Sequence, residues 1–311
     1  MNTTKSTGTG ALLAALMITA VAGTATAQTI PIETVKISGG NSADSTGYGA
    51  VSYDYYIGTK EVTNAQYAAF LNAVASQSDT YALYNTNMAS YGLTRSGSAG
   101  NWTYTATDPN KPVVYVSFWD AARFCNWLTS GETEVGVYNF GGAANPTNTS
   151  VSRDADAWAA GGWALPTENE WYKAAYYNPG TDSYSLYPTG KNTIAAGDAN
   201  YGGTGATTDA GSYAANPNGT FDQGGNVWEW NDSIINTTAR GVRGGSFSSY
   251  GDFLASSARN SSPAPFEFNY LGFRVVASSL TAVPEPSTWA GAMGLMTLVF
   301  GVWVRRGRRT L

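Results

Sequence analysis

Apolar side chains recur with helical spacing in two stretches of the chain. The first covers residues 63–74, in which one helix face carries Tyr67, Phe70, Leu71 and Val74. The second covers residues 117–128, in which one face carries Phe118, Ala121, Ala122, Cys125 and Leu128. Thr63 and Ser117 begin the two stretches, and hydroxyl side chains are favoured at helix N-termini. The pattern therefore predicts one amphipathic helix over each range.

A third, shorter helix is predicted after the Leu-Pro pair at 165–166. Thr167 is followed three residues later by Glu170, which is the spacing of a capping box. Short apolar runs over 113–116 and 272–276 predict strands, and the chain between the elements is rich in turn-forming Gly, Asn and Pro. We therefore expect an α+β fold with much irregular backbone.

Two residue counts exclude whole classes of site. The 311 residues contain no histidine, which excludes a Ser-His-Asp triad, a His-ligated zinc or iron site and imidazole as a general base. The one cysteine, Cys125, has no second cysteine for a disulfide, a CxxC pair or a multi-thiolate metal site. Because Cys125 falls on the apolar face of a predicted helix, we expect a buried side chain rather than a nucleophile.

The charge balance argues against a nucleic-acid partner. The formal net charge is -5, and five of the 17 basic residues lie in the two terminal segments described next. The remainder is therefore more acidic than the whole chain, whereas phosphate binding needs a basic surface. With 43% hydrophobic residues, the 311-residue chain can bury a sizeable core.

Residues 1–27 have the pattern of a secretory signal peptide. Lys5 precedes an apolar stretch over 11–18, and the small residues at 25–27 suit cleavage before Gln28. We expect the domain to span residues 28–280 of an exported protein. A buried N-terminal helix is the alternative for the first segment.

Residues 281–311 form a tail of three parts. Val-Pro-Glu-Pro-Ser at 283–287 precedes an uncharged apolar run over 288–304 and an arginine cluster at 305–309. The run is near the lower length limit for a transmembrane helix, and the arginines would stay cytoplasmic. The tail resembles the PEP-CTERM sorting signal of Gram-negative bacteria. That resemblance implies an exosortase-type protease as partner and a membrane-anchored intermediate that ends at the cell surface or outside the cell; a plain tail anchor is the alternative.

Six segments in fixed order carry a second resemblance. They are YIGTKEVTNAQY at 56–67, PVVYVSFWDA at 112–121, LPTENEW at 165–171, GGNVWEW at 224–230, RGGSF at 243–247 and NYLGFR at 269–274. Together they resemble the formylglycine-generating enzyme family, also called the sulfatase-modifying factor domain, over roughly residues 31–279. The resemblance implies a compact variant of the C-type-lectin-like fold with little regular secondary structure.

The resemblance implies copper chemistry only for chains that keep the family's ligands. Active members hold copper with two cysteines and oxidise a sulfatase cysteine to formylglycine. The first cysteine follows a segment like Gly-Gly-Ser-Phe, where this chain has Ser246 and Ser249. A serine hydroxyl is a hard, neutral donor and a poor replacement for the thiolate that Cu(I) prefers. We therefore expect no copper site and no catalytic residue here, and the three histidines that hold iron in a second branch of the family are absent.

The resemblance also implies a calcium site around GGNVWEW. Matched residue by residue, its ligands would be oxygens of Asp222, Gly225, Val227 and Glu229, with Asn200 carried over from a second family site. Ca²⁺ takes six to eight hard oxygens from carboxylates and carbonyls, and glycine lets the chain curl around an ion. Calcium is therefore the expected cofactor.

Ordinary structural roles are the alternative for these residues. Asp222 and Glu229 would then cap turns and pair with an arginine, for instance Arg243 or Arg274, and we expect both arginines to be buried and to bridge carbonyls. Six aromatic residues could stack on sugar rings, although we expect most of them to pack in the core. They are Trp102, Tyr104, Trp158, Trp163, Tyr187 and Tyr213.

Three functions remain open from the sequence. The favoured one is an exported, calcium-stabilised surface binding module without the oxidase activity, with extracellular polysaccharide or a protein as ligand. The second is an enzyme that modifies sulfatases or other peptides with ligands other than cysteine. The third is a structural extracellular matrix protein that assembles through an aromatic, low-charge surface. The missing thiols and the sorting tail favour the first.

Overall fold

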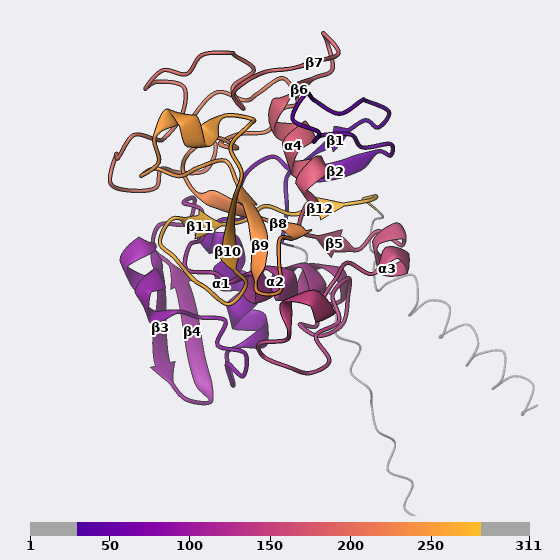
Figure 1. The fold of residues 1–311 in the computed structure, drawn as a ribbon. Helices are drawn as coiled ribbons and strands as arrows, with labels where there is room; N and C mark the ends of the chain where they lie inside the picture. Colours follow the sequence, from indigo (N-terminus) through magenta and orange to yellow (C-terminus); the bar gives the residue numbers. More distant parts are fainter. Residues whose placement is uncertain (1–29, 281–311) are drawn as a thin grey trace, which may run out of the picture.

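The fold is described by a computed structural model for residues 30–280 (Figure 1). The α-helices are α1 (Asn64–Val74), α2 (Phe118–Ser130), α3 (Ala155–Ala159) and α4 (Glu168–Tyr176), and the 3-10 helices are η1 (Thr86–Tyr91), η2 (Asn148–Ser150) and η3 (Gly251–Leu254). The strands are β1 (Thr34–Ile37), β2 (Tyr55–Gly58), β3 (Leu93–Ser98), β4 (Asn101–Ala106), β5 (Trp163–Ala164), β6 (Tyr177–Asn178), β7 (Ser183–Tyr184), β8 (Trp228–Ile234), β9 (Ala239–Arg243), β10 (Asn260–Pro263), β11 (Leu271–Gly272) and β12 (Val276–Ala277). The short elements and long connections confirm the α+β class.

Two four-stranded sheets form the framework. In the first sheet the order is β1-β2-β12-β5, and all neighbours are antiparallel. In the second the order is β10-β9-β8-β11, with β11 parallel to β8 and the other pairs antiparallel. The hairpins β3–β4 and β6–β7 are separate two-stranded sheets. Figure 1 shows β8, β9 and β10 side by side in the middle of the molecule.

The three predicted helices are present. In each, the hydroxyl of the N-cap residue accepts a hydrogen bond from the third helical N–H, and the third side chain accepts one from the cap N–H in return. These capping boxes start α1 at Thr63, α2 at Ser117 and α4 at Thr167. Capping satisfies backbone donors that the first helical turn leaves unpaired, so the local sequence fixes where each helix begins.

The two predicted strands are wrong in detail. Residues 113–116 form no strand, because Tyr115 takes a left-handed φ of 59° that breaks extended backbone. Residues 272–276 are not one strand: Gly272 ends β11, which pairs with β8, and Val276 begins β12, which pairs with β2 and β5. The backbone between them crosses from one sheet to the other.

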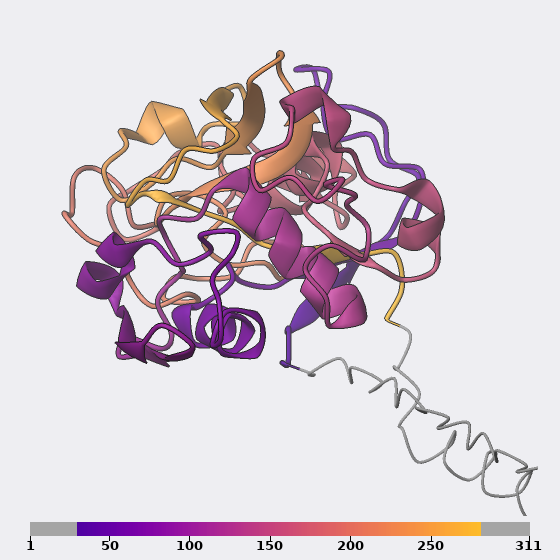
Figure 2. The same ribbon diagram turned by 90° about the horizontal axis from the view of Figure 1, so that it is seen from below.

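Helix α2 lies at the centre of the core. The ring centroid of Phe124 lies 5.4 Å from those of Phe70 in α1 and of Phe273. The ring centroids of Phe118 and of Trp230 in β8 are 5.9 Å apart. Figure 2 shows α2 crossing the middle of the domain, with α1 seen end-on to one side. Cys125 is fully buried here, as expected for a small apolar side chain.

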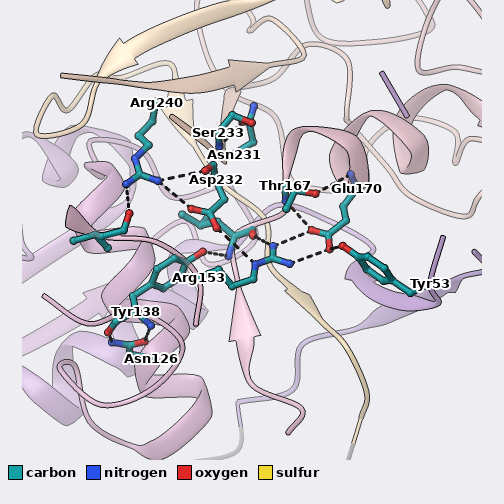
Figure 3. A network of polar contacts seen from close by, with 12 residues as sticks. Tyr53, Asn126, Tyr138, Arg153, Thr167, Glu170, Asn231, Asp232, Ser233 and Arg240 are labelled. Atoms are coloured by element: carbon teal, nitrogen blue, oxygen red, sulfur yellow. Dashed lines mark hydrogen bonds and ion pairs between the residues drawn. The ribbon is translucent and has the colours of Figure 1, made fainter. Parts of the chain in front are cut away.

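A buried ionic network joins α4 to the second sheet (Figure 3). Arg153 donates to both carboxylate oxygens of Glu170 at 2.9 Å and lies 3.6 Å from Asp232 of β8. Asp232 also pairs with Arg240 of β9 at 3.1 Å. Burial raises the pKa of Asp232 to about 6, although both arginines oppose the rise. The network fixes α4 relative to β8 and β9, which lead into the candidate site.

The predicted signal peptide at 1–27 and sorting tail at 281–311 lie outside the described residues. Among residues 30–280, no helix is long and apolar enough to cross a membrane. The export signal, the short transmembrane helix of the tail and the boundaries of the 28–280 domain therefore stay predictions.

Candidate functional site

The segment after β9 makes a tight turn that only glycine allows. Gly244 and Gly245 have φ values of 97° and 74°. A Cβ on Gly244 would lie 2.6 Å from the Gln223 carbonyl oxygen. Glycine is the residue that adopts positive φ without steric cost and lets backbone segments approach closely. The turn therefore brings the following residues, Ser246 to Ser249, back against the second sheet.

Three serines after this turn form a hydrogen-bonded cluster. The Ser246 hydroxyl lies 3.2 Å from the Ser249 hydroxyl and 3.1 Å from that of Ser248, and the Ser249 hydroxyl accepts from the Ser246 N–H at 3.0 Å. Ser246 and Ser249 are buried, and Ser248 is exposed. These neutral hydroxyls already bond to one another and offer no thiolate, so the donor set does not fit Cu(I).

Beside the serines the surface is hollowed and lined by aromatic rings. Two adjoining hollows of about 250 Å³ each share Trp228, Asn260 and Tyr270. We call them together the aromatic hollow. Its aromatic side chains are Trp228, Tyr250, Phe253, Phe266, Phe268 and Tyr270, and its polar ones are Ser248, Ser249, Asn260, Ser261 and Ser262.

The expected calcium residue Glu229 takes part in a buried ion pair. Arg274 donates to both of its carboxylate oxygens, at 2.6 and 2.7 Å, and Trp171 Nε1 donates a third bond at 2.7 Å. Arg274 also donates to the carbonyl of Gly58 at 3.0 Å. Neither Glu229 nor Arg274 is exposed. This is the structural alternative named for Glu229, and Arg274 is the carbonyl-bridging buried arginine that we expected.

Arg243 is also a buried structural arginine. It donates to Glu168 at 2.6 Å and to the Ser256 carbonyl at 3.1 Å. Arg259 donates to the other oxygen of the same carboxylate at 2.6 Å. Burial opposes ionisation of Glu168, and the hydrogen bond and charge of the two arginines lower its pKa below the usual range. This cluster holds α4 against the segment that follows the serine turn.

Two further carboxylates lie near the Glu229–Arg274 pair. Glu61 accepts one hydrogen bond from Asn226 at 2.9 Å, and its Oε2 has no hydrogen-bond partner within residues 30–280. Burial, followed by the negative charge of Asp222, raises the pKa of Glu61 well above its usual value. Burial also raises the pKa of Asp222. Three buried carboxylates thus share one arginine.

The remaining expected calcium residues meet in the same region. The Asn226 N–H donates to the Asn200 carbonyl at 2.8 Å, and the Asn200 side chain donates to the Asn226 side chain at 3.1 Å. Gly225 must be glycine, because its φ is 84° and a Cβ would lie 2.3 Å from the Asn200 carbonyl oxygen. Val227 follows directly and is buried. No group of three or more Asp, Glu, His or Cys side chains in the described part of the chain is arranged to hold a metal ion by itself.

Sequence reasoning missed Glu61 and the aromatic hollow. Glu61 lies in the first of the six family-like segments, beside Lys60, and only its burial distinguishes it. Tyr250 and Phe266 lie in loops and Phe253 lies in the short helix η3, so no periodic pattern in the sequence separates them from core aromatics. Of the six aromatics considered first, Tyr104 is buried, and Trp102, Trp158 and Trp163 pack against the core.

Comparisons with known proteins agree with this fold. Residues 19–279 match the model of the sulfatase-modifying factor enzyme 1-like domain. A serine/threonine-protein kinase, pkn1, of Chlamydia pneumoniae is 26% identical over 180 residues, 58% of this chain and 23% of the kinase. A hercynine oxygenase of Mycobacterium tuberculosis is 40% identical over 88 residues, 26% of this chain and 20% of the oxygenase. The matched stretches thus span less than a quarter of these relatives.

Two solved structures share the fold over most of the chain. Treponema denticola variable protein 1 aligns with a TM-score of 0.59 at 21% identity, covering 82% of this chain and 98% of the other. The crystal structure of CarF aligns with a TM-score of 0.56 at 23% identity, covering 79% of this chain and 98% of CarF. They bear out the formylglycine-generating-enzyme type of fold expected from the sequence. The chain therefore belongs to the family of the sulfatase-modifying factor enzyme 1-like domain.

Proposed function

We propose that this chain is an exported surface binding module of its family that does not catalyse the copper-dependent oxidation. One observation carries the proposal: serine hydroxyls occupy the segment where active members have a copper-binding cysteine, and Cys125 is buried in α2. A buried thiol with a raised pKa is neither a metal ligand nor a nucleophile. Without a copper site, the aromatic hollow beside the serines can still bind a ligand, and binding is therefore the activity that we propose.

The iron-dependent activity of the second branch of the family does not fit this chain either. One relative is a hercynine oxygenase, which the chain matches over a fifth of the oxygenase's length. Three histidines hold iron in that branch, and the 311 residues contain none. Similarity to this relative over one segment of the fold therefore does not imply iron-dependent chemistry in this protein.

Calcium is the proposed stabilising ion. Asp222, the carbonyls of Gly225 and Val227, and Asn200 would hold it, with Glu229 shared with Arg274. Support comes from charge: Glu61, Asp222 and Glu229 are buried around one arginine, and burial raises the pKa of Glu61 and Asp222. A divalent cation would stabilise the ionised forms of these carboxylates. Within residues 30–280 no group donates a hydrogen bond to the Glu61 Oε2, which is consistent with a missing counter-charge. The ion would supply rigidity rather than chemistry.

Export and surface location complete the proposal. The N-terminal pattern supports secretion, and the C-terminal tail supports recognition by an exosortase-type protease. The ligand would then be an extracellular polysaccharide or a protein. The rivals remain a peptide-modifying enzyme with ligands other than cysteine and a structural matrix protein.

The test combines metal analysis, melting and an activity assay on residues 28–280. We expect the purified protein to contain bound calcium and no tightly bound copper. A chelator should lower its melting temperature, and added calcium should restore it. We also expect no formylglycine in a sulfatase-motif peptide incubated with copper and oxygen. Conversion of the peptide, lost in Ser246→Ala or Ser249→Ala, would establish the enzyme instead. Concentration-dependent assembly without a saturable ligand would favour the matrix protein.

A further inference from the structure

The exposed aromatic side chains of the domain are concentrated around the aromatic hollow. Tyr250 is 75% exposed, Phe266 49% and Phe253 46%. These are three of the eight large hydrophobic side chains exposed within residues 30–280, and they include both exposed phenylalanines. Large apolar groups that gather on a surface mark a ligand or partner site, whereas scattered ones do not.

The hollow lies across the face of the second sheet rather than along its edge. Its lining takes Trp228 from β8, Val242 from β9, residues 260–263 from β10 and Leu271 from β11. Beside it, Phe268 and Tyr270 stack at 5.1 Å with their planes 5° apart, and Phe266 packs on Phe268 at 5.8 Å. All four strands therefore contribute to the lining, and the stacked rings come from the segment between β10 and β11.

The polar groups of the hollow are neutral. Serine hydroxyls and the Asn260 amide line it, and no lining residue in the described part of the chain is Asp, Glu, Lys or Arg. The Ser262 side chain is buried, and its hydroxyl has no hydrogen-bond partner among residues 30–280. A charged ligand would lose hydration here without gaining a counter-ion, so the site favours a neutral one.

Resting on the proposed binding function, we infer that the aromatic hollow binds neutral sugar rings of an extracellular polysaccharide. Aromatic faces pack against the C–H face of a pyranose, while hydroxyl and amide groups bond its rim. Each hollow, at about 250 Å³, is slightly smaller than a drug-sized pocket of roughly 300 Å³ and suits one ring. Two adjoining hollows suit neighbouring sugars of one chain.

A peptide is the less suitable occupant. An extended peptide binds most simply by adding to a sheet edge, where its backbone finds unpaired partners. The edge strand β10 is only four residues long and ends in Pro263, which has no N–H to offer. The hollow instead presents side chains across the sheet face, which a peptide backbone cannot pair with as a strand.

Affinity electrophoresis tests the inference on the protein of residues 28–280 with calcium. The gels contain dextran, laminarin, xylan or galactomannan as neutral probes and alginate or hyaluronate as anionic ones. We expect at least one neutral polysaccharide to retard the protein. Tyr250→Ala and Phe253→Ala should each raise the dissociation constant about tenfold or more. Tyr250→Ala should also leave the melting temperature unchanged, because the Tyr250 side chain is 75% exposed.

Tyr213→Ala is the matched control, because Tyr213 is an aromatic residue outside the lining of the hollow. Its retardation should equal that of the unsubstituted protein. No retardation by any neutral probe, retardation by the anionic probes alone, or retardation that survives both hollow variants overturns the inference. Binding of a peptide in the hollow overturns it too but leaves the proposed function standing, whereas formation of formylglycine with copper contradicts the proposed function itself.

Discussion

Arg274 and Glu229 form a two-bond ion pair with neither side chain exposed, and the distances are 2.6 and 2.7 Å. The pair joins the segment between β11 and β12 to the first residues of β8. Because Arg274 also faces Glu61 and Asp222 through its charge, it compensates more than one carboxylate. Its removal leaves buried negative charge without a partner, which costs more than the pair itself contributes.

Arg274→Met should therefore destabilise the domain strongly. Removing one partner of a buried pair costs about 3–5 kcal/mol. Urea unfolding measures the loss. Lys191→Met is the control, because the Lys191 side chain is 56% exposed in its pair with Asp198, and such pairs contribute about 1 kcal/mol or less. Equal losses in the two variants would contradict the assigned role of Arg274.

Asp120 should make stability depend on pH. Burial, helped by the charge of Glu267, raises its pKa to about 7, so the folded state holds a proton that the unfolded state releases near pH 4. Stability from this group is fully present at low pH and falls as pH rises from about 4 to about 7. The fall should reach a few kcal/mol, on the order of 1.4 kcal/mol per pH unit.

Asp120→Asn should remove this dependence, because an amide does not titrate. Both Ser117 hydrogen bonds go to one carboxylate oxygen, so the amide oxygen can keep the helix cap. The measurement is the difference in unfolding free energy between variant and unsubstituted protein at pH 4, 5.5 and 7. A difference that stays constant over this range would refute the role of Asp120.

Gly225→Ala should destabilise the domain by more than the cost of placing an alanine in left-handed backbone. A left-handed alanine costs roughly 1–2 kcal/mol, and the new Cβ would also meet the Asn200 carbonyl oxygen at 2.3 Å. Gly202→Ala is a close control, since Gly202 has a φ of 81° with nothing within 4 Å of its Cβ position. Thermal melting measures both variants, and the extra loss of stability in Gly225→Ala is the cost of the contact between the new Cβ and the Asn200 carbonyl oxygen. Equal losses would show that the turn can shift.

Cys125 should not react with thiol reagents in the folded protein. Its side chain is fully buried, and burial raises the pKa of the thiol well above its usual value. Ellman titration should give no colour in buffer and one thiol per chain in 6 M urea. Rapid reaction in buffer would place the thiol at the surface and reopen the question of a copper ligand.

Local patterns predicted the helices because their signals are local. A hydroxyl followed three residues later by Gln, Asp or Glu starts each of α1, α2 and α4, and the partners are neighbours in sequence. The run over 113–116 misled for the opposite reason. Its apolar residues are buried by packing, while the left-handed Tyr115 follows from contacts that no short window contains.

Only those parts of the candidate site that lie within one continuous segment of the chain could be predicted from the sequence. The serine segment and the burial of Arg274 could be predicted from short motifs. The aromatic hollow draws on residues 228, 248–253 and 260–271, which tertiary structure alone brings together. The Glu61–Asp222 relationship likewise joins residues more than 150 positions apart, so no spacing in the sequence indicates it.

The segment from Leu271 to Ala277 gives one strand to each sheet, with Arg274 between them. Neither sheet is complete until this segment is in place, and among residues 30–280 it supplies the last two strands in chain order. During synthesis from the N-terminus, neither sheet can therefore be completed before residues 271–277 have been made. We expect the two sheets to melt as a single cooperative unit, and a chain cut before residue 271 to lose the connection between them.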